Sequence, residues 1–309
     1  MAYILLFFLL SLKSINSKAS ELTDLDKAAE KYCYVRQLCK PPLSDWPNHD
    51  LGGITIDWEG AVGIAQAVMK STSLKAISFH LCNMTDLTAK PLLLSFINHP
   101  TLEKVDLGFN DFRSESHKLL AEVINNNITL KSLDLSMTNF IGDQTTRLFE
   151  AVYMSPSLKE LIFDLNIFEF EAAKKLSALK EPNTSLERLS LSFASVSSRA
   201  LTELSCNIHQ LKALKSLNLS ANLLTDKDAE VMALLAYHSQ TLEELDLSNN
   251  NLTSSFVHHF QKQWSLYPKD KKQRPKPLTI YLTKKSKVST YHPSPIWSIS
   301  SGPRPVYIL

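Results

Sequence analysis

Apolar residues recur along the chain in a fixed spacing. Residues 102–112 read L-E-K-V-D-L-G-F-N-D-F and residues 242–252 read L-E-E-L-D-L-S-N-N-N-L, so both have apolar residues at places one, four, six and eleven. The stretches that share this opening begin at Leu74, Leu102, Leu130, Leu158, Leu186, Leu214 and Leu242, each 28 residues after the previous one. A period of this size in unbroken register predicts a solenoid, in which each turn of chain stacks on the next.

The first half of each turn predicts a short strand. Its fourth and sixth places are apolar in every turn: Ile77/Phe79, Val105/Leu107, Leu133/Leu135, Leu161/Phe163, Leu189/Leu191, Leu217/Leu219 and Leu245/Leu247. Alternate side chains of a strand point to the same side, so we expect all fourteen to face the interior.

The second half of each turn predicts a helix, because apolar residues recur there at helical spacing. The nineteenth place holds Leu92, Leu120, Leu148, Leu176, Leu204, Met232 and Phe260, and a second apolar residue follows four places later in most turns. One period earlier, Ile64 and Val68 follow a degenerate strand near 51–56 and predict an eighth, N-terminal turn. Residues 277–282 alternate like a final edge strand.

The pattern L-x-x-L-x-L-x-x-N-x-L resembles the leucine-rich repeat, and a full helix within 28 residues resembles its ribonuclease-inhibitor-like subclass. The resemblance covers about residues 46–282. It implies an α/β solenoid curved like a horseshoe, with parallel strands on the concave face and helices on the convex face. It also implies that the ninth-place residues form a ladder of hydrogen bonds to the backbone: Cys82, Asn110, Thr138, Asn166, Asn222 and Asn250, with Ala194 as a departure.

The repeats divide the chain into four segments. The solenoid takes residues 46–283, as about eight repeats and the final edge strand, behind an N-terminal cap at 20–45. Residues 1–19 contain an apolar run, 2–12, with small residues suitable for cleavage after Ala19, but no basic residue precedes the run. A signal peptide and export, or an uncleaved cytoplasmic protein, are both open. Residues 284–309 are rich in proline and predict a disordered basic tail.

Charge is unevenly distributed. The chain has 309 residues, 44% of them hydrophobic, and a net charge of +2. Residues 269–309 hold nine basic residues and one acid, so the preceding part is mildly acidic. Four cysteines, Cys33, Cys39, Cys82 and Cys206, are too few and too scattered for a disulfide framework or a zinc module. Cys206 is expected to be a buried hydrophobe on its helix.

Acidic residues dominate the places between the strand leucines. The predicted concave face carries six acids, against two bases, Lys104 and Arg188: Asp106, Asp134, Glu160, Asp164, Glu244 and Asp246. A partner with a basic surface is the natural inference, because complementary potentials steer association. The alternative is that Asp and Ser merely suit these strand positions.

The eighth place is apolar where a polar or variable residue is usual. It holds Leu81, Phe109, Met137, Leu165 and Phe193, followed by Ala221 and Asn249. The five large side chains predict a column along one rim that binds a protein partner. The alternative is that the rim curls inward and buries them.

The sequence does not support catalysis. No nucleophile, base and orienting residue recur within reach of one another, and no glycine-rich phosphate loop is present. His258 and His259 lack a third metal ligand in the sequence nearby, so we expect no metal and no cofactor.

The sequence therefore predicts a non-catalytic protein-interaction scaffold that binds through the concave face and the apolar rim. We expect a monomer without a transmembrane span that binds a protein rather than nucleic acid. Two alternatives stay open: a regulator of a small GTPase or other enzyme, and a secreted microbial effector that mimics host leucine-rich repeat proteins.

Overall fold

A computed structural model describes residues 48–179, 185–267, 277–282 and the backbone of 306–308. The predicted signal peptide at 1–19, the N-terminal cap at 20–45, Cys33 and Cys39, and residues 284–305 of the predicted tail lie outside the described residues. The chain forms two compact units, which meet in the sequence between Asp134 and Leu135.

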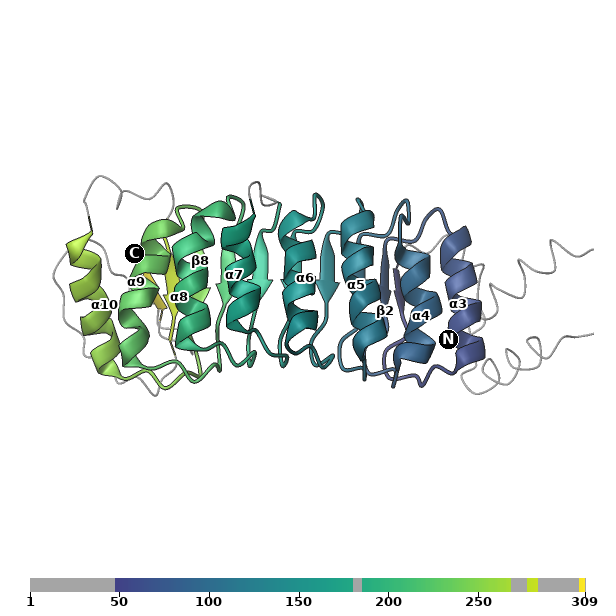
Figure 1. Ribbon diagram of the computed structural model, residues 1–309, viewed down its shortest axis with the longest axis horizontal. Helices are drawn as coiled ribbons and strands as arrows, with labels where there is room; N and C mark the ends of the chain where they lie inside the picture. Colours follow the sequence, from purple (N-terminus) through teal and green to yellow (C-terminus); the bar gives the residue numbers. More distant parts are fainter. Residues whose placement is uncertain (1–47, 180–184, 268–276, 283–305, 309) are drawn as a thin grey trace, which may run out of the picture. The chain divides into compact units, whose positions relative to one another are not determined.

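The first unit contains the first three turns of the coil and the strand of the fourth. Its strands pair in parallel, each with the strand of the next turn: β1 (Asn48–Asp50), β2 (Ala76–Ser78), β3 (Lys104–Asp106) and β4 (Ser132–Asp134). One helix follows each of the first three strands: α3 (Trp58–Lys70), α4 (Asp86–Phe96) and α5 (Ser114–Asn126). The helices lie side by side on one face of the strands (Figure 1).

The second unit repeats this arrangement. Its parallel strands are β5 (Glu160–Ile162), β6 (Arg188–Ser190), β7 (Ser216–Asn218), β8 (Glu244–Asp246) and β9 (Thr279–Tyr281). Its helices are α6 (Asp143–Met154), α7 (Phe170–Ala178), α8 (Ser198–Asn207), α9 (Ala229–His238) and α10 (Ser254–Leu266), with short 3₁₀ turns at Ile208–Gln210 and Asp226–Asp228. The helices again cover one face of the strands (Figure 1). The predicted class, an α/β solenoid of parallel strands alternating with helices, is confirmed.

The repeating apolar places form the core of both units. All fourteen side chains at the fourth and sixth places are buried, and so are the seven at the nineteenth place. The paired strands from β1 to β4 and from β5 to β8 keep the 28-residue register residue by residue, as in Ile77 opposite Val105. Strand β9 follows a longer last turn, so Thr279 lies opposite Glu244. Each turn therefore buries its apolar face against its neighbours rather than within itself.

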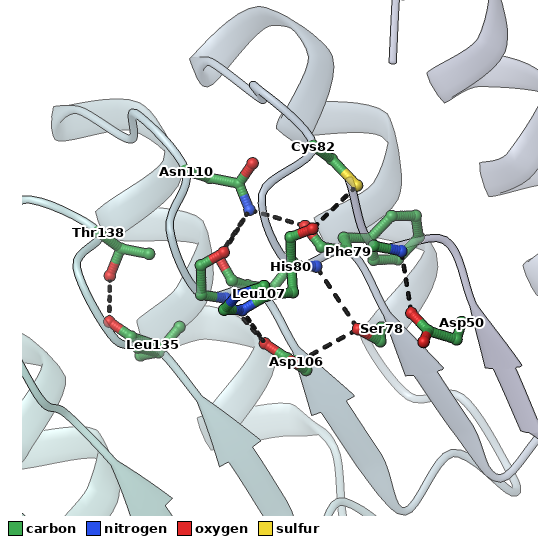
Figure 2. Close-up of polar contacts among 12 residues, drawn as sticks. Asp50, Ser78, Phe79, His80, Cys82, Asp106, Leu107, Asn110, Leu135 and Thr138 are labelled. Atoms are coloured by element: carbon green, nitrogen blue, oxygen red, sulfur yellow. Dashed lines mark hydrogen bonds and ion pairs between the residues drawn. The ribbon is translucent and has the colours of Figure 1, made fainter. Parts of the chain in front are cut away.

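The ninth-place ladder is present. The Asn110 amide donates to the Phe79 and Leu107 carbonyls at 2.9 and 2.8 Å, and its oxygen accepts from the Met84 N–H at 2.9 Å (Figure 2). Asn166, Asn222 and Asn250 also donate to the carbonyl 31 residues earlier, at 2.7–2.9 Å. These amides satisfy backbone groups that the end of each strand leaves unpaired inside the protein.

Three turns have another residue in place of the asparagine. The Thr138 hydroxyl donates to the Leu135 carbonyl at 2.5 Å. At Ala194 the residue's own carbonyl accepts from the Phe168 N–H at 2.8 Å, and at Cys82 the carbonyl accepts from the Ile56 N–H at 3.2 Å. The Cys82 thiol also lies 3.1 Å from the Leu51 carbonyl. Burial raises the pKa of Cys82, so this cysteine acts as a small buried thiol.

A second ladder closes the helix-to-strand bend at the twenty-sixth place, which the sequence analysis did not predict. The Asn127 amide donates to the Phe96 carbonyl at 2.7 Å, and its oxygen accepts from the Thr129 and Leu130 N–H groups, both at 2.8 Å. One turn earlier, His99 takes the same place with its ring nitrogens. The His99 ring makes the same kinds of hydrogen bond as the Asn127 amide, which explains why a histidine is buried there.

Three expectations need correction. The additional N-terminal turn exists, but its strand is β1, one period before β2. The apolar Leu51 and Ile56, which suggested a strand at 51–56, are buried at the sixth and eleventh places of this turn. Strand β9 is not an edge strand, because β10 (Val306–Ile308) pairs with it antiparallel. Strand β10 belongs to the tail that was predicted to be disordered, so that prediction is wrong for Val306–Ile308. An added strand satisfies edge N–H and C=O groups. Cys206 is exposed rather than buried.

Candidate protein-binding surface

The eighth place of every described turn has a left-handed backbone. The seven eighth-place residues from Leu81 to Asn249 have φ between 50° and 58°. Gly53, at the eighth place of the first turn, has φ 73°. The hydrogen-bond pattern repeats as well: the N–H of the eighth residue donates to the seventh-place carbonyl of the next turn, as from Leu165 to Ser192 at 2.9 Å. The fold thus imposes this conformation on whichever residue occupies the place.

Left-handed backbone favours glycine and asparagine and is costly for bulky side chains. Gly53 in the first unit and Asn249 in the second fit that preference. The residues between them do not: Leu81, Phe109, Met137, Leu165 and Phe193 are all large and apolar. The turn itself does not require these side chains.

In the second unit the large eighth-place side chains are exposed. The exposed fractions are 50% for Met137, 43% for Leu165 and 58% for Phe193. Met137 and Leu165 each donate to the following turn, at 2.8 and 2.9 Å, so the three residues stand on consecutive turns. The alternative that the rim buries them as core is wrong for this unit.

The seventh turn, counted from the turn with Gly53, adds a residue that the sequence pattern did not single out. Ala221 takes the eighth place, but Leu223, two residues later, is 77% exposed and also left-handed, with φ 58°. The signal in the sequence was a large apolar residue, Leu223, at the tenth place of its turn. Met137, Leu165, Phe193 and Leu223 are called the apolar stripe below.

The first unit shows a related pair. Leu81 is 55% exposed, whereas Phe109 is half-buried and packs on the His80 ring, with 4.8 Å between ring centroids. Phe109 therefore packs against a ring of its own unit and is less exposed than the three stripe residues at the same place.

The acidic strand face of the first unit is organised by its own hydrogen bonds. Asp106 accepts from the Gly108 N–H at 2.9 Å and from the Ser78 hydroxyl at 3.2 Å, and His80 Nδ1 lies 3.8 Å from its carboxylate (Figure 2). A Cβ on Gly108 would lie 3.1 Å from His80 Nδ1 and 3.5 Å from the Asp134 carboxylate, so the missing side chain makes room for this group.

The second unit uses its strand-face acids in the same way. Asp246 accepts from the Ser248 N–H at 2.8 Å, and Asp164 accepts from the Ser190 hydroxyl at 2.6 Å and the Ser192 N–H at 2.9 Å. Burial raises the pKa of Asp164 against the opposing effect of those two hydrogen bonds.

The remaining strand-face acids differ from one another. Glu160 forms an ion pair with Arg188 at 2.8 Å, whereas Glu244 is exposed. Much of the acidity therefore serves the strand ends, which supports the structural alternative for Asp106, Asp164 and Asp246.

The polar groups near His80 are not arranged for nucleophilic catalysis. The Ser78 hydroxyl donates to the Asp106 carboxylate rather than to the His80 imidazole, so these side chains do not form the serine–histidine pair of a nucleophilic site. Within the described residues, no cluster of three or more His, Cys, Asp or Glu side chains is suited to hold a metal ion. None of the helices in that part of the chain has both the length and the apolar character needed to cross a membrane.

The fold and this surface define the class of protein: a repeat solenoid with hydrogen-bonded polar ladders in its interior and an exposed apolar stripe. Residues 241–263 match the family described as Leucine Rich Repeat, and residues 126–144 match another described as Leucine Rich repeat. With seven unbroken turns in the sequence, these matches make the chain a leucine-rich repeat protein. The ribonuclease-inhibitor-like subclass stays a prediction.

No curated protein matches the chain in sequence. Among solved structures, the leucine-rich repeat-containing protein LegL7 from Legionella pneumophila is 15% identical, covers 76% of this chain and 82% of its own, and has a TM-score of 0.47. A Bacteroides fragilis protein is 14% identical over 88% and 86%, with a TM-score of 0.44. The Caenorhabditis elegans tropomodulin C-terminal domain is 15% identical over 44% and 83%, at 0.38. Similarity at TM-scores below 0.5 does not indicate a shared function.

Proposed function

We propose that this protein is a non-catalytic scaffold that binds a partner protein through its apolar eighth-place residues. The observation that carries the proposal is the combination of exposure and backbone conformation at Met137, Leu165 and Phe193. A left-handed backbone costs roughly 1–2 kcal/mol for a residue with a Cβ, and less for asparagine. Exposed apolar side chains that also add strain are typical of residues retained for binding.

The acidic strand face has a smaller part in this proposal than the sequence suggested. Asp106 and Asp246 each accept an N–H two residues ahead, and Asn218 does the same for Ser220 at 2.9 Å. Since an uncharged amide serves at the same place, the hydrogen bond rather than the charge explains this choice. We propose that Glu244 and the other acids tune the approach of a basic partner without fixing it in place.

The test uses the double variant Leu165→Asn/Phe193→Asn. Asparagine is the residue at Asn249, so the turn already accepts it. Relief of strain should offset the partial burial that is lost, and the free energy of unfolding should stay within about 1 kcal/mol of the parent. Proteins captured from extracts of the source organism should include at least one that the parent binds and the double variant does not.

The matched control is Leu266→Asn, which removes a similarly exposed leucine, 71% exposed, from the last residue of α10. Binding should survive this change. If the double variant captures the same partners as the parent, the stripe is not the binding surface. If the double variant instead loses more than about 2 kcal/mol, its side chains belong to the core.

A further inference from the structure

We propose that the apolar stripe of the second unit binds an amphipathic α-helix of the partner protein, with basic residues flanking the helix's apolar face. This inference rests on the proposed function, since it names the kind of element that the same surface fits. It is carried by the spacing of the stripe residues and by the charges around them.

The spacing follows from the strand ladder. Met137, Leu165 and Phe193 stand one turn apart, and each donates its N–H to the next turn, at 2.8, 2.9 and 3.1 Å. Neighbouring strands lie ~4.8 Å apart, so the two steps from Met137 to Phe193 span ~9.6 Å. A binding segment that runs along the stripe must present apolar side chains at about this interval.

An α-helix meets this requirement best. Successive turns place residues of one face ~5.4 Å apart, so two turns span ~10.8 Å and differ from the stripe by ~1.2 Å. Alternate residues of an extended strand lie ~6.6 Å apart and differ by ~3.6 Å over the same two steps. A polyproline helix repeats every ~9.3 Å, so it would cover Met137 and Phe193 but pass over Leu165.

The loops that carry the stripe supply the charge preference. Between the seventh and twelfth places, the turns of the second unit contain two acids, Asp164 and Glu169, and no lysine or arginine. Asp164 directly precedes Leu165, and both acids are half-buried. Basic residues beside the apolar face of a bound helix would therefore meet the two acids of these loops, whereas acidic residues would be repelled by them.

The apolar partner contacts extend over four turns. Leu223 is exposed on the turn that follows Phe193, two residues beyond the eighth place, and Asn249 ends the eighth-place series with a polar side chain. A helix of about three to four turns covers this length. Its apolar residues would follow the i, i+4, i+7, i+11 pattern of helices bound in grooves.

The experiment selects binders without assuming a sequence. A displayed library of random 20-residue peptides is selected on the full-length protein and counter-selected on the Leu165→Asn/Phe193→Asn double variant. The enriched peptides should show apolar residues at i, i+4, i+7 and i+11 with lysine or arginine beside them. A synthetic copy should gain helical circular dichroism on binding, and a proline at its centre should weaken binding at least tenfold.

Other outcomes overturn the inference in distinguishable ways. Double-variant-sensitive peptides with alternating or proline-rich patterns would refute the helix but leave the proposed function standing. Enrichment of acidic helices would refute the charge preference. If no enriched peptide distinguishes the parent from the double variant, the helix inference fails, while the proposed function is judged separately by the capture experiment.

Discussion

Replacing His99 by asparagine should remove a pH dependence of stability that the fold builds into the second ladder. The His99 ring is buried: its Nε2 lies 2.9 Å from the Val68 carbonyl, and its Nδ1 accepts from the Thr101 and Leu102 N–H groups at 3.3 and 3.1 Å. Nδ1 can accept these bonds only when it is unprotonated. The folded state therefore requires the neutral imidazole.

The sign of the effect follows from the pKa. Burial lowers the pKa of His99 below its usual 6.5, against the opposing effect of the Val68 carbonyl. Above pH 6.5 the ring is neutral in both states, and its contribution to stability is complete. Below pH 6.5 His99 binds a proton in the unfolded chain but not in the folded protein. The free energy of unfolding therefore falls by up to about 1.4 kcal/mol per pH unit until the folded pKa is reached. From pH 7 to pH 5 the loss is at most about 1.9 kcal/mol.

The asparagine variant is suited to this test because Asn127 makes the same set of bonds one turn later. At pH 7 His99→Asn should cost about 1 kcal/mol through lost ring packing. Between pH 7 and pH 5 it should lose less stability than the parent. Urea unfolding followed by circular dichroism at several pH values measures both, and His258→Asn, on the exposed face of α10, controls for the loss of a histidine as such. Equal losses in the parent and in His99→Asn would refute the reasoning.

Three further changes test other parts of the fold by unfolding measurements. Asn222→Ala should cost about 2–3 kcal/mol, because it leaves the buried Leu191 carbonyl and Val196 N–H without their ladder partner; a loss below about 0.5 kcal/mol would contradict that role. Tyr153→Phe should leave stability unchanged or raise it by about 1 kcal/mol, because the hydroxyl is buried without a hydrogen-bond partner among the described residues, and a clear loss would show that it has one. Glu187 accepts from Lys215 and Lys159 at 2.7 and 3.0 Å, which lowers its pKa from 4.5 to about 2. Its contribution should be complete above pH 4.5 and fade as the pH falls toward 2, so Glu187→Gln should flatten acid unfolding in that window, by less than about 1 kcal/mol in physiological salt.

The sequence predicted the fold well because its main signal repeats. A single apolar residue says little about its neighbours, but Leu133 and Leu135 recur with the same spacing in six other turns, and a solenoid buries such places only if the turns stack in register. The places of the strands, helices and ninth-place ladder all follow from that register. The exception is the N-terminal turn, where the strand was expected near 51–56 and β1 instead lies at Asn48–Asp50, one period before β2.

The tertiary structure decided which polar residues are used internally. His99 and Asn127 differ in type, so no repeated letter marked the second ladder; their shared role depends on bonds to carbonyls 31 residues away. Likewise, Asp106 and Asp246 stand on the strand face as the sequence predicted, but their bonds to nearby N–H groups exist only once the strand end turns.

The sequence by itself determined the repeat, the inward apolar places and the unusual apolar residues at the eighth place. Only the tertiary structure decided that the second unit exposes Met137, Leu165 and Phe193 on left-handed backbone and that Leu223 joins them. Burial depends on what the neighbouring turns cover, and φ at the eighth place is fixed by a hydrogen bond to the next turn. Neither quantity is a property of the local sequence, because both are set by residues of the neighbouring turns.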